Sequence, residues 1–426
     1  MSKATLRPSG PLRGVCTVSG DKSITQRLIL LGALAQGSTR IEGGNEGADA
    51  RAAIGIVKTL GVPVRATGAG SWTIRGGSLR ESDRVLDAKN SGTALRLSMG
   101  LLAAQPFFSV LTGDASLRRR PLHRVIEPLR ALGADLAARD RDRLAPVAIR
   151  GRRLHGASVR TKVASAQVKS ALLLAAIQAE GESSIEEAAP TRDHTERLLP
   201  RFGAPITQEN GRVHVRGPAS LHGIDVRVPG DFSAAAFLWA AAAIVPRSDV
   251  TVRGVGVNPT RRAFLDLLAR AGAEVEEVDP REESGEPVAD VRVRARALAP
   301  IHVDADDARA MIDELPLAAV LAAFAKGESV IRGAEELRVK ESDRIATVGA
   351  GLRAIGVPCE DRPDGWVIQG NGAPRGGLVV SEGDHRIAMA FLIAGLRARD
   401  GVRVEGVEAA AVSDPGFLPR LKGLLR

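Results

Sequence analysis

Apolar residues fall in six long runs that are hydrophobic on nearly all sides, and each run precedes a short stretch rich in β-branched residues. The runs occupy residues 23–37, 91–105, 166–181, 232–246, 314–327 and 385–401, and the following stretches occupy 38–43, 107–113, 183–190, 249–254, 329–333 and 402–406. A helix without a polar face has to be buried, and short β-branched stretches favour strands. The pattern therefore predicts six buried helices, each followed by a strand.

These runs belong to a repeated unit whose copies begin about 70 residues apart, near Asp21, Asn90, Ser165, Asp231, Asp313 and Asp384. Asp, Asn and Ser are favoured N-caps, because their side chains accept a hydrogen bond from an unpaired backbone N–H group. Second helical stretches, at 48–61, 123–134, 194–204, 260–273 and 343–356, and further strand-like stretches lie between the runs. One unit therefore contains two helices and about four strands. The predicted fold class is α+β, with mixed sheets packed around buried helices.

The chain of 426 residues is too long for one ordinary core and suits two domains of about 200 residues each. The strongest boundary signals are Ser19-Gly20-Asp21 and Pro229-Gly230-Asp231, which precede the first and fourth copies. We expect three copies in each of two lobes, with hinge closure around a cleft. The predicted division is a first lobe of residues 21–230 and a second lobe of residues 1–20 plus 231–426, with the hinge near 19–21 and 229–231.

Charge and composition narrow the function classes. The formal net charge is +9, and the basic residues are scattered, with no run longer than Arg118-Arg119-Arg120. Aromatic residues make up only 3% and Tyr is absent, so bases would find little to stack on and we expect no nucleic-acid partner. The basic surplus then fits small acidic substrates. The longest apolar stretch, 232–245, is too short to cross a membrane, and residues 1–15 lack the apolar segment of a signal peptide, so we expect a cytoplasmic enzyme without a membrane partner.

The two cysteines, Cys16 and Cys359, have neither CxxC spacing nor a neighbouring His cluster. The simplest interpretation is two small hydrophobic side chains in a reducing compartment. The sequence shows no metal-binding motif and no Gly-rich nucleotide loop, and we expect neither a metal nor a cofactor.

Polar residues at two predicted helix starts suit anion binding. Lys22 and Ser23 would bring an ammonium group and a hydroxyl to exposed backbone N–H groups, and Arg27 lies one turn further on the same side. The alternative is an ordinary capped helix with an exposed Lys. Gly92, in Asn90-Ser91-Gly92-Thr93, would let a ligand approach the backbone closely. The alternative there is a tight strand-to-helix turn.

Other residues suit the recognition of carboxylate or phosphate groups and proton transfer. Arg120, Arg344 and Arg386 carry the fork-shaped donors that bind such anions, although in an Arg-rich chain each alone also fits a solvated surface residue. Asp313 and Glu341 are the acid/base candidates. Alone, Asp313 also fits an N-cap and Glu341 a partner in a charged surface stretch.

Taken together, the ordered motifs resemble the EPSP synthase family (3-phosphoshikimate 1-carboxyvinyltransferases) almost from end to end. The matching segments are residues 20–25 with Arg27, 90–93 with Arg96, 111–114 with Arg120-Pro121, 165–170, 191–196, 313–316, 338–344 and 384–386. The resemblance implies two similar domains, each of three βαβαββ-type units with buried helices (an inside-out α/β prism), and an active site between them. It also implies transfer of the enolpyruvyl group of phosphoenolpyruvate (PEP) to the 5-hydroxyl of shikimate 3-phosphate, with release of phosphate.

The resemblance assigns substrate contacts to residues of both lobes. It places at shikimate 3-phosphate the residues Lys22, Ser23, Arg27, Ser165, Ala166, Gln167, Arg192, Asp313 and Lys340, with Lys169 as a further candidate. It places at PEP the residues Lys22, Asn90, Gly92, Arg120, Gln167, Arg344 and Arg386, with His385 as a further candidate for orienting or sharing a proton. The implied catalytic residues are Asp313 for the hydroxyl proton and Glu341 for the methylene carbon, assisted by Lys22 or Lys340. Some family members that resist the inhibitor glyphosate carry Ala at the position of Gly92, so this chain is expected to be sensitive.

A few positions depart from the family pattern. Gln26 stands where many members have His, and Lys89 where Gly is usual. Val412 and Asp414 stand where some members carry a ligand-binding Lys and an aromatic residue, so no C-terminal contact is assigned. The nearest alternative is a UDP-N-acetylglucosamine enolpyruvyl transferase, whose mobile-loop Cys has no counterpart in residues 112–120. An RNA 3′-phosphate cyclase would need a nucleotidylated His and an ATP site that the sequence does not show. We expect a monomer.

Overall fold

The computed structural model describes residues 2–425, and the chain separates into two compact units. The central unit comprises residues 20–228 together with 283–286. The terminal unit comprises the N-terminal segment up to residue 19, residues 229–282 and the chain from 287 onward. Each unit has its own hydrophobic core. The chain therefore changes unit not only near residues 20 and 229 but also on either side of the four residues 283–286.

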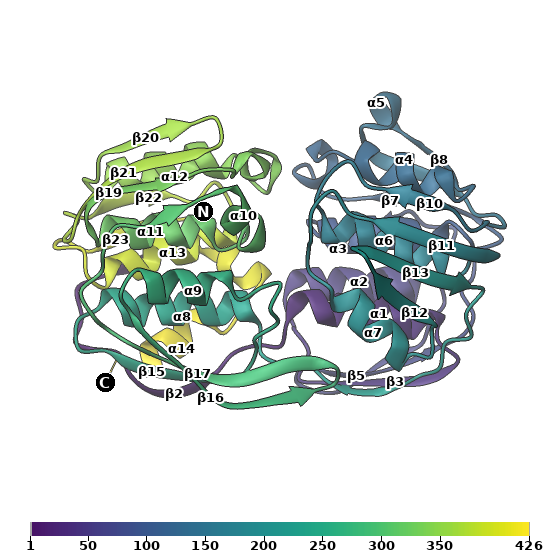
Figure 1. Ribbon diagram of the computed structural model, residues 1–426, viewed down its shortest axis with the longest axis horizontal. Helices are drawn as coiled ribbons and strands as arrows, with labels where there is room; N and C mark the ends of the chain where they lie inside the picture. Colours follow the sequence, from purple (N-terminus) through teal and green to yellow (C-terminus); the bar gives the residue numbers. More distant parts are fainter. Residues whose placement is uncertain (1, 426) are drawn as a thin grey trace. The chain divides into compact units, whose positions relative to one another are not determined.

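In the central unit, three main helices are joined to three four-stranded sheets (Figure 1). The main helices are α1 (Lys22–Leu34), α3 (Gly92–Leu102) and α6 (Ala166–Ala176), and the other helices are α2 (Ala48–Thr59), α4 (His123–Ala131), α5 (Arg139–Asp142), α7 (His194–Arg201) and the 3₁₀ turn η1 (Leu117–Arg119). The sheets are β14 (Asp225–Arg227), β3 (Gly37–Glu42), β5 (Ser71–Gly76), β4 (Val64–Gly68); β6 (Leu86–Asp87), β7 (Phe108–Thr112), β9 (Leu144–Arg150), β8 (Asp135–Ala138); and β10 (Ser158–Arg160), β11 (Gly181–Glu186), β13 (Arg212–Gly217), β12 (Ile206–Glu209), each in spatial order.

The terminal unit repeats this arrangement. Its main helices are α8 (Phe232–Ile244), α11 (Leu315–Ala323) and α13 (His385–Gly395), and the other helical elements are α9 (Ala263–Arg270), α10 (Ala305–Ala310), α12 (Arg344–Ala354), α14 (Phe417–Gly423), η2 (Glu335–Val339) and η3 (Val407–Val412). Its sheets are β16 (Glu274–Glu283), β17 (Glu286–Arg294), β15 (Asp249–Gly256), β2 (Arg13–Thr17); β18 (His302–Val303), β19 (Lys326–Ile331), β21 (Gly365–Asn371), β20 (Cys359–Arg362); and β1 (Lys3–Leu6), β23 (Val402–Glu405), β22 (Gly377–Val380).

One strand order recurs in the four-stranded sheets. The strand that follows a main helix pairs on one side with a short parallel strand, which we call the leading strand of the copy. On its other side it pairs with an antiparallel strand. For example, β3 pairs in parallel with β14 and antiparallel with β5. In the terminal unit, the leading strand of the fourth copy is β2, from the N-terminal segment. The sixth copy has a three-stranded sheet in which β1 pairs antiparallel with β23. The predicted α+β class with mixed sheets and a repeated unit is confirmed.

The prediction of buried main helices is also confirmed. Every residue of α8 and of α11 is buried, and the main helices lie inside the strands of their own unit (Figure 1). Small residues allow the helices to approach closely. At Gly100 in α3, an added Cβ would lie 1.9 Å from the carbonyl oxygen of Ala171 in α6, so only Gly fits. The Ala- and Gly-rich runs therefore permit backbone contact between main helices.

Helix caps follow the prediction at four of the six copies. The side chains of Asp21, Ser165, Asp231 and Asp384 accept hydrogen bonds from backbone N–H groups at the starts of α1, α6, α8 and α13. In the second copy the N-cap is Ser91 rather than Asn90, whose Oδ1 accepts a hydrogen bond from Arg120 instead. In the fifth copy α11 begins one residue later than an Asp313 cap would require, and the capping position, Glu314, makes no side-chain cap bond.

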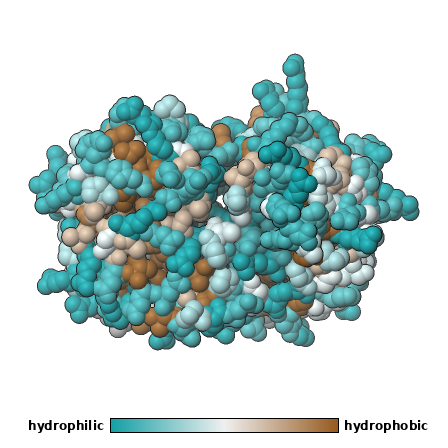
Figure 2. Space-filling view, in the orientation of Figure 1, coloured by the Kyte–Doolittle hydropathy of each residue, from teal (hydrophilic) through white to brown (hydrophobic). Residues whose placement is uncertain are grey.

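Hydrophilic residues cover most of the face shown in Figure 2, with smaller hydrophobic areas between them. This distribution follows from the burial of the apolar helices in each unit. Across residues 2–425, no helix combines the length and the apolar character needed to cross a membrane.

Candidate active site

At the start of α1, the central unit carries two predicted ligands beside a buried cation. Lys22 is the first residue of the helix and Ser23 the second, and the Lys22 ammonium lies 2.9 Å from a carboxylate oxygen of Asp49 in α2. Arg27, only 3% exposed, donates from Nη1 to the Ser23 carbonyl oxygen at 3.0 Å. The structure therefore places these three predicted ligands of shikimate 3-phosphate in the first turns of one helix.

The Arg27 guanidinium is held by hydroxyl groups rather than by a carboxylate. Its Nε donates to Thr195 Oγ1 and its Nη2 to Ser170 Oγ, each at 2.8 Å. No carboxylate in residues 2–425 makes an ion pair with it. Burial and, to a smaller extent, the nearby charge of Arg192 lower the pKa of Arg27 to about 10, against the opposing charge of Glu196. A desolvated cation without a directly bonded counterion favours the arrival of an anion.

A second cluster surrounds Gly92, the first residue of α3. An added Cβ on Gly92 would lie 3.1 Å from Arg96 Nη1, 3.5 Å from Arg120 Nη1 and 3.8 Å from Gln167 Oε1. Arg120 is buried, and its Nη2 donates to Asn90 Oδ1 at 2.6 Å. The space left by the missing side chain therefore faces two guanidinium groups, which suits a small carboxylate or phosphate.

The start of α6 supplies the third group of predicted ligands. Ser165 is the N-cap, and Ala166 is the first helical residue, so its backbone N–H group has no partner within the helix. Gln167 donates to Thr93 Oγ1 at 2.9 Å and accepts a hydrogen bond from Arg96. Gln167 therefore links the N-terminal turns of α6 and α3.

The remaining predicted residues of the central unit are Arg192 and Lys169, which lies in α6. Arg192 belongs to the connection between β11 and α7, and its charge acts on the buried guanidinium of Arg27. Lys169 is only 2% exposed, and its ammonium contacts Glu196 Oε1 at 2.6 Å and Glu187 Oε2 at 2.7 Å. The structure thus gives Lys169 a set of protein partners that the sequence did not indicate.

In the terminal unit, the predicted acids and bases gather around Arg344, the first residue of α12. Arg344 is 1% exposed and contacts Glu341 Oε2 at 2.7 Å, Asp384 Oδ2 at 2.7 Å and Asp313 Oδ1 at 3.9 Å. Burial alone would lower the pKa of Arg344, but the carboxylates of Asp384 and Glu341 raise it well above its usual range. Arg344 is therefore a permanent cation that holds two candidate acids in place.

Arg386 and Lys340 complete the terminal-unit cluster. Arg386, buried near the start of α13, donates to the Asp313 carbonyl oxygen at 3.0 Å and lies 3.5 Å from its carboxylate. Burial lowers the pKa of Lys340, while the charges of Asp313 and Glu336 act in the opposite direction. A lysine with a lowered pKa can exchange protons more readily. His385, the other candidate here, is the buried first residue of α13.

Some of the partners in these clusters could not be named from the sequence motifs. Asp49 pairs with Lys22, Asp384 with Arg344, and Glu314 lies 3.7 Å from Arg386 Nη1. Asp384 and Glu314 lie within the motif segments 384–386 and 313–316, so a search for buried acids beside the predicted cations could have found them as partners. Asp49 lies in a different helix from Lys22 and outside the motif segments, so no sequence feature indicated that the two residues would pair.

The departures from the family pattern have local explanations. Gln26 is buried and its Oε1 accepts a hydrogen bond from the Ser91 hydroxyl at 2.7 Å, so it supports the cap of α3. Lys89 has φ of 54°, in the left-handed region where Gly is usual. Its ammonium pairs with Asp87 at 2.7 Å. Asp414 is buried between Ser19 and Arg420, which gives it a structural role.

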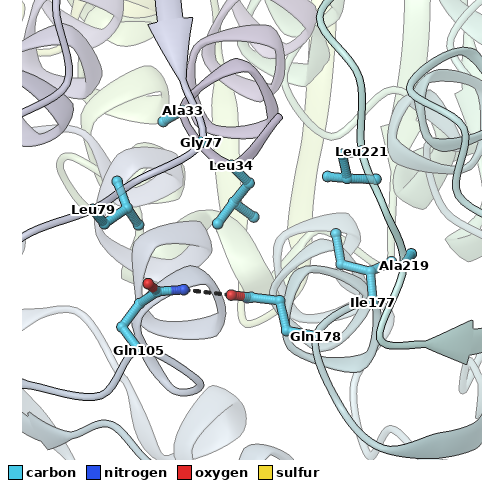
Figure 3. Close-up of a pocket in the computed structure, with 9 residues that line it drawn as sticks. All are labelled: Ala33, Leu34, Gly77, Leu79, Gln105, Ile177, Gln178, Ala219 and Leu221. Carbon is cyan, nitrogen blue, oxygen red and sulfur yellow. Dashed lines mark hydrogen bonds between the residues drawn. The ribbon is translucent and has the colours of Figure 1, made fainter. Parts of the chain in front are cut away.

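A cavity of about 190 Å³ lies at the opposite ends of the central-unit helices (Figure 3). Leu34 is the last residue of α1, and Gln105 and Gln178 follow α3 and α6. The amides of these two Gln residues are joined by a hydrogen bond of 2.5 Å (Figure 3). No charged residue lines this cavity, so it does not suit the acidic substrates that the cation clusters indicate. Within residues 2–425, no group of three or more His, Cys, Asp and Glu side chains is arranged to hold a metal ion.

The fold and these clusters define the class of the protein. An enolpyruvyl transferase structure from Streptomyces tendae, NikO, shares the fold, with a TM-score of 0.80 over 98% of this chain and 96% of that one, at 18% identity. The EPSP synthase structure from Acinetobacter baumannii is more similar in sequence, with 40% identity, a TM-score of 0.88 and coverage of 99% of this chain and 98% of that chain. The class is therefore that of the enolpyruvyl transferases.

The family within this class is also shown. A family model described as EPSP synthase (3-phosphoshikimate 1-carboxyvinyltransferase) matches residues 6–421. A 3-phosphoshikimate 1-carboxyvinyltransferase from Acidithiobacillus ferrooxidans is 48% identical over 430 residues, covering 100% of this chain and 99% of that protein. One from Alkalilimnicola ehrlichii is 49% identical over 417 residues, covering 97% and 93%. The chain belongs to the EPSP synthase family.

Proposed function

We propose that this chain transfers the enolpyruvyl group of PEP to the 5-hydroxyl of shikimate 3-phosphate and releases phosphate, a step of the shikimate pathway to chorismate and the aromatic amino acids. The observation that carries the proposal is the buried Arg27 guanidinium without a carboxylate partner, one helix turn from Lys22 and Ser23. We infer the reaction from the membership of the chain in the EPSP synthase family. The UDP-N-acetylglucosamine reaction is not favoured, because the relatives are named as 3-phosphoshikimate enzymes.

The central unit provides the binding groups in this proposal. The phosphate of shikimate 3-phosphate lies against Ser23, Arg27 and Arg192, and its ring lies near Ser165, Ala166 and Gln167. PEP occupies the space beside Gly92, where Asn90, Arg120, Gln167 and Lys22 hold its phosphate and carboxylate. Support comes from the convergence of the Arg96, Arg120 and Gln167 side chains on the empty side of Gly92. Positively charged helix starts add to the attraction of both anions.

The terminal unit provides the proton-transfer groups. The 5-hydroxyl of shikimate 3-phosphate loses its proton to Asp313 as its oxygen attacks C2 of PEP, and Glu341 protonates the methylene carbon, giving a tetrahedral intermediate with a methyl group. Loss of a methyl proton back to Glu341 then restores the double bond, and the C2–O bond to phosphate breaks. Lys340, whose pKa burial lowers, binds shikimate 3-phosphate and assists proton transfer.

Arg344 and Arg386 stabilise the charge that develops in this scheme. Arg344 contacts both proposed acid/base groups and stays protonated, because the carboxylates around it raise its pKa. Arg386 holds the backbone and carboxylate of Asp313. In this proposal both guanidinium groups also bind the carboxylate or phosphate of PEP. Fixed cations of this kind stabilise a transition state without reorganising during the reaction. His385 adjoins Arg386 and is proposed to orient it.

The decisive experiment measures phosphate release from PEP by the purified chain with shikimate 3-phosphate, with UDP-N-acetylglucosamine and with neither. We expect release only with shikimate 3-phosphate, and a product whose mass shows the added enolpyruvyl group. Equal release without shikimate 3-phosphate, or release that depends on the nucleotide sugar, would contradict the proposal. We further propose a cytoplasmic monomer with no nucleic-acid partner, for which light scattering should give a mass near 44.7 kDa.

A further inference from the structure

Lys169 lies deep in the central unit with every donor occupied by protein atoms. Its ammonium contacts Glu196 at 2.6 Å, Glu187 at 2.7 Å and the Thr191 carbonyl oxygen at 3.5 Å. A lysine ammonium has three N–H donors. The family resemblance makes Lys169 a candidate ligand of the substrate phosphate, but these contacts leave no donor for a ligand.

The two carboxylates flank the segment that presents Arg192. Glu187 immediately follows β11, and Glu196 is the third residue of α7. Glu187 also accepts hydrogen bonds from the backbone N–H group and the hydroxyl of Thr191. Lys169 therefore ties the beginning and the end of the 187–196 segment to α6, the helix that starts with the predicted ligands Ser165 and Ala166.

The arrangement of Glu187 and Glu196 depends on the positive charge of Lys169. Burial raises the pKa of Glu196, and the ammonium of Lys169 acts against that rise. Two nearly buried carboxylates without Lys169 would repel each other and could not keep this geometry. Ser170, which follows Lys169, and Thr195, which precedes Glu196, bond to each other at 2.7 Å and to Arg27. The cluster thus adjoins the hydroxyl pair that holds the buried guanidinium.

We propose that Lys169 is a positioning residue that fixes Arg192 beside Arg27 and thereby sets the affinity for the phosphate group of shikimate 3-phosphate without touching it. The inference rests on the proposed function. Support comes from the contacts of Lys169 with Glu187 and Glu196 at the two ends of the segment that carries Arg192, and the charge of Arg192 acts on the pKa of Arg27. Two adjacent guanidinium groups match the oxygens of a phosphate dianion.

The test must separate positioning from stability. Lys169→Met alone leaves two buried carboxylates without a cation, so a triple variant with Lys169→Met, Glu187→Gln and Glu196→Gln removes all three charges while keeping side-chain volume. We expect binding of shikimate 3-phosphate by the triple variant, measured by calorimetry, to weaken by about tenfold or more. Binding of shikimate, which lacks the phosphate, should change by less than about twofold. Lys162→Met, which removes an exposed ion pair with Glu127, should change neither affinity.

A double-mutant cycle with Arg192→Ala identifies the route of the effect. If Lys169 acts through Arg192, the triple substitution should weaken binding of shikimate 3-phosphate little further once Arg192 is absent. Full additivity would overturn the inference, as would an unchanged affinity for shikimate 3-phosphate or an equal loss for shikimate and its phosphate. Phosphate release by the unaltered enzyme is measured alongside. Its absence would refute the proposed function, whereas its presence together with any of these outcomes would refute only the role of Lys169.

Discussion

Replacing Gly92 by Ala tests where PEP binds. The new methyl group would lie 3.1 Å from Arg96 Nη1, 3.5 Å from Arg120 Nη1 and 3.8 Å from Gln167 Oε1. All three atoms are ends of flexible side chains, which can move by a few tenths of an ångström, and Ala is at least as favourable as Gly in a helix. The folded protein should therefore keep its stability, whereas the space for a ligand between the two guanidinium groups shrinks.

The expected loss can be estimated from overpacking. Forcing one methyl group into a filled site costs about 1–3 kcal/mol, which corresponds to about 5- to 150-fold in affinity. We expect Gly92→Ala to raise the KM for PEP and the inhibitory concentration of glyphosate within this range, and to leave binding of shikimate 3-phosphate nearly unchanged. Steady-state kinetics and calorimetry measure these quantities.

A matched control is available in the same unit. Gly55 also lies in a helix, and an added Cβ there meets no atom within 4 Å. Gly55→Ala should leave both kinetics and inhibition unchanged. If Gly92→Ala behaves like the control, with unchanged KM for PEP and unchanged glyphosate sensitivity, then PEP does not lie beside Gly92 and the proposed arrangement of the central unit is wrong.

Three further predictions concern packing, proton transfer and the thiols. Gly100→Ala should destabilise the central unit by about 3 kcal/mol, because its Cβ would overlap a backbone carbonyl of α6, and an unchanged unfolding midpoint in urea would contradict that packing. Asp313→Asn and Glu341→Gln should each lower kcat by about 10²- to 10⁴-fold in the phosphate-release assay, and a loss below about threefold would remove that residue from the proton-transfer scheme. Burial raises the pKa of Cys16 to about 11 and of Cys359 to about 12, so both thiols should stay protonated at pH 8. Because the thiolate is the reactive form, Cys16 should react with a thiol reagent about 100-fold, and Cys359 about 1,000-fold, more slowly than in the unfolded chain, and equal rates would refute this.

Much of the fold could be predicted from the hydrophobic pattern, because a helix that is apolar on all sides has to lie in the interior. The buried helices α8 and α11 follow directly from their sequences. The residues at which helices begin are harder to predict from the sequence. Neighbouring polar residues compete for the capping position, and at Asn90-Ser91 the Oδ1 of Asn90 is taken by Arg120, which is distant in sequence.

The candidate site could be predicted as a set of residues but not as a set of contacts. Motif spacing places Lys22, Arg27 and Arg344 near helix starts, whereas ion pairs depend on which helices pack together. The pairing of Lys22 with Asp49 requires the packing of α1 on α2. The enclosure of Lys169 by two acids requires α6, β11 and α7 to meet. The proposed substrate contacts and the predicted hinge remain predictions for the experiments above.

The N-terminal strands have a consequence for biosynthesis. The strands β1 and β2, translated before the central unit, pair with β23 and β15, and the partner of β1 begins only at Val402. On the ribosome, residues 20–228 emerge with nearly all of the partners they need, whereas β2 must wait for β15 and β1 must wait for β23. A chain that stalls before Val402 would thus leave β1 unpaired, so this strand is secured only long after it has been translated.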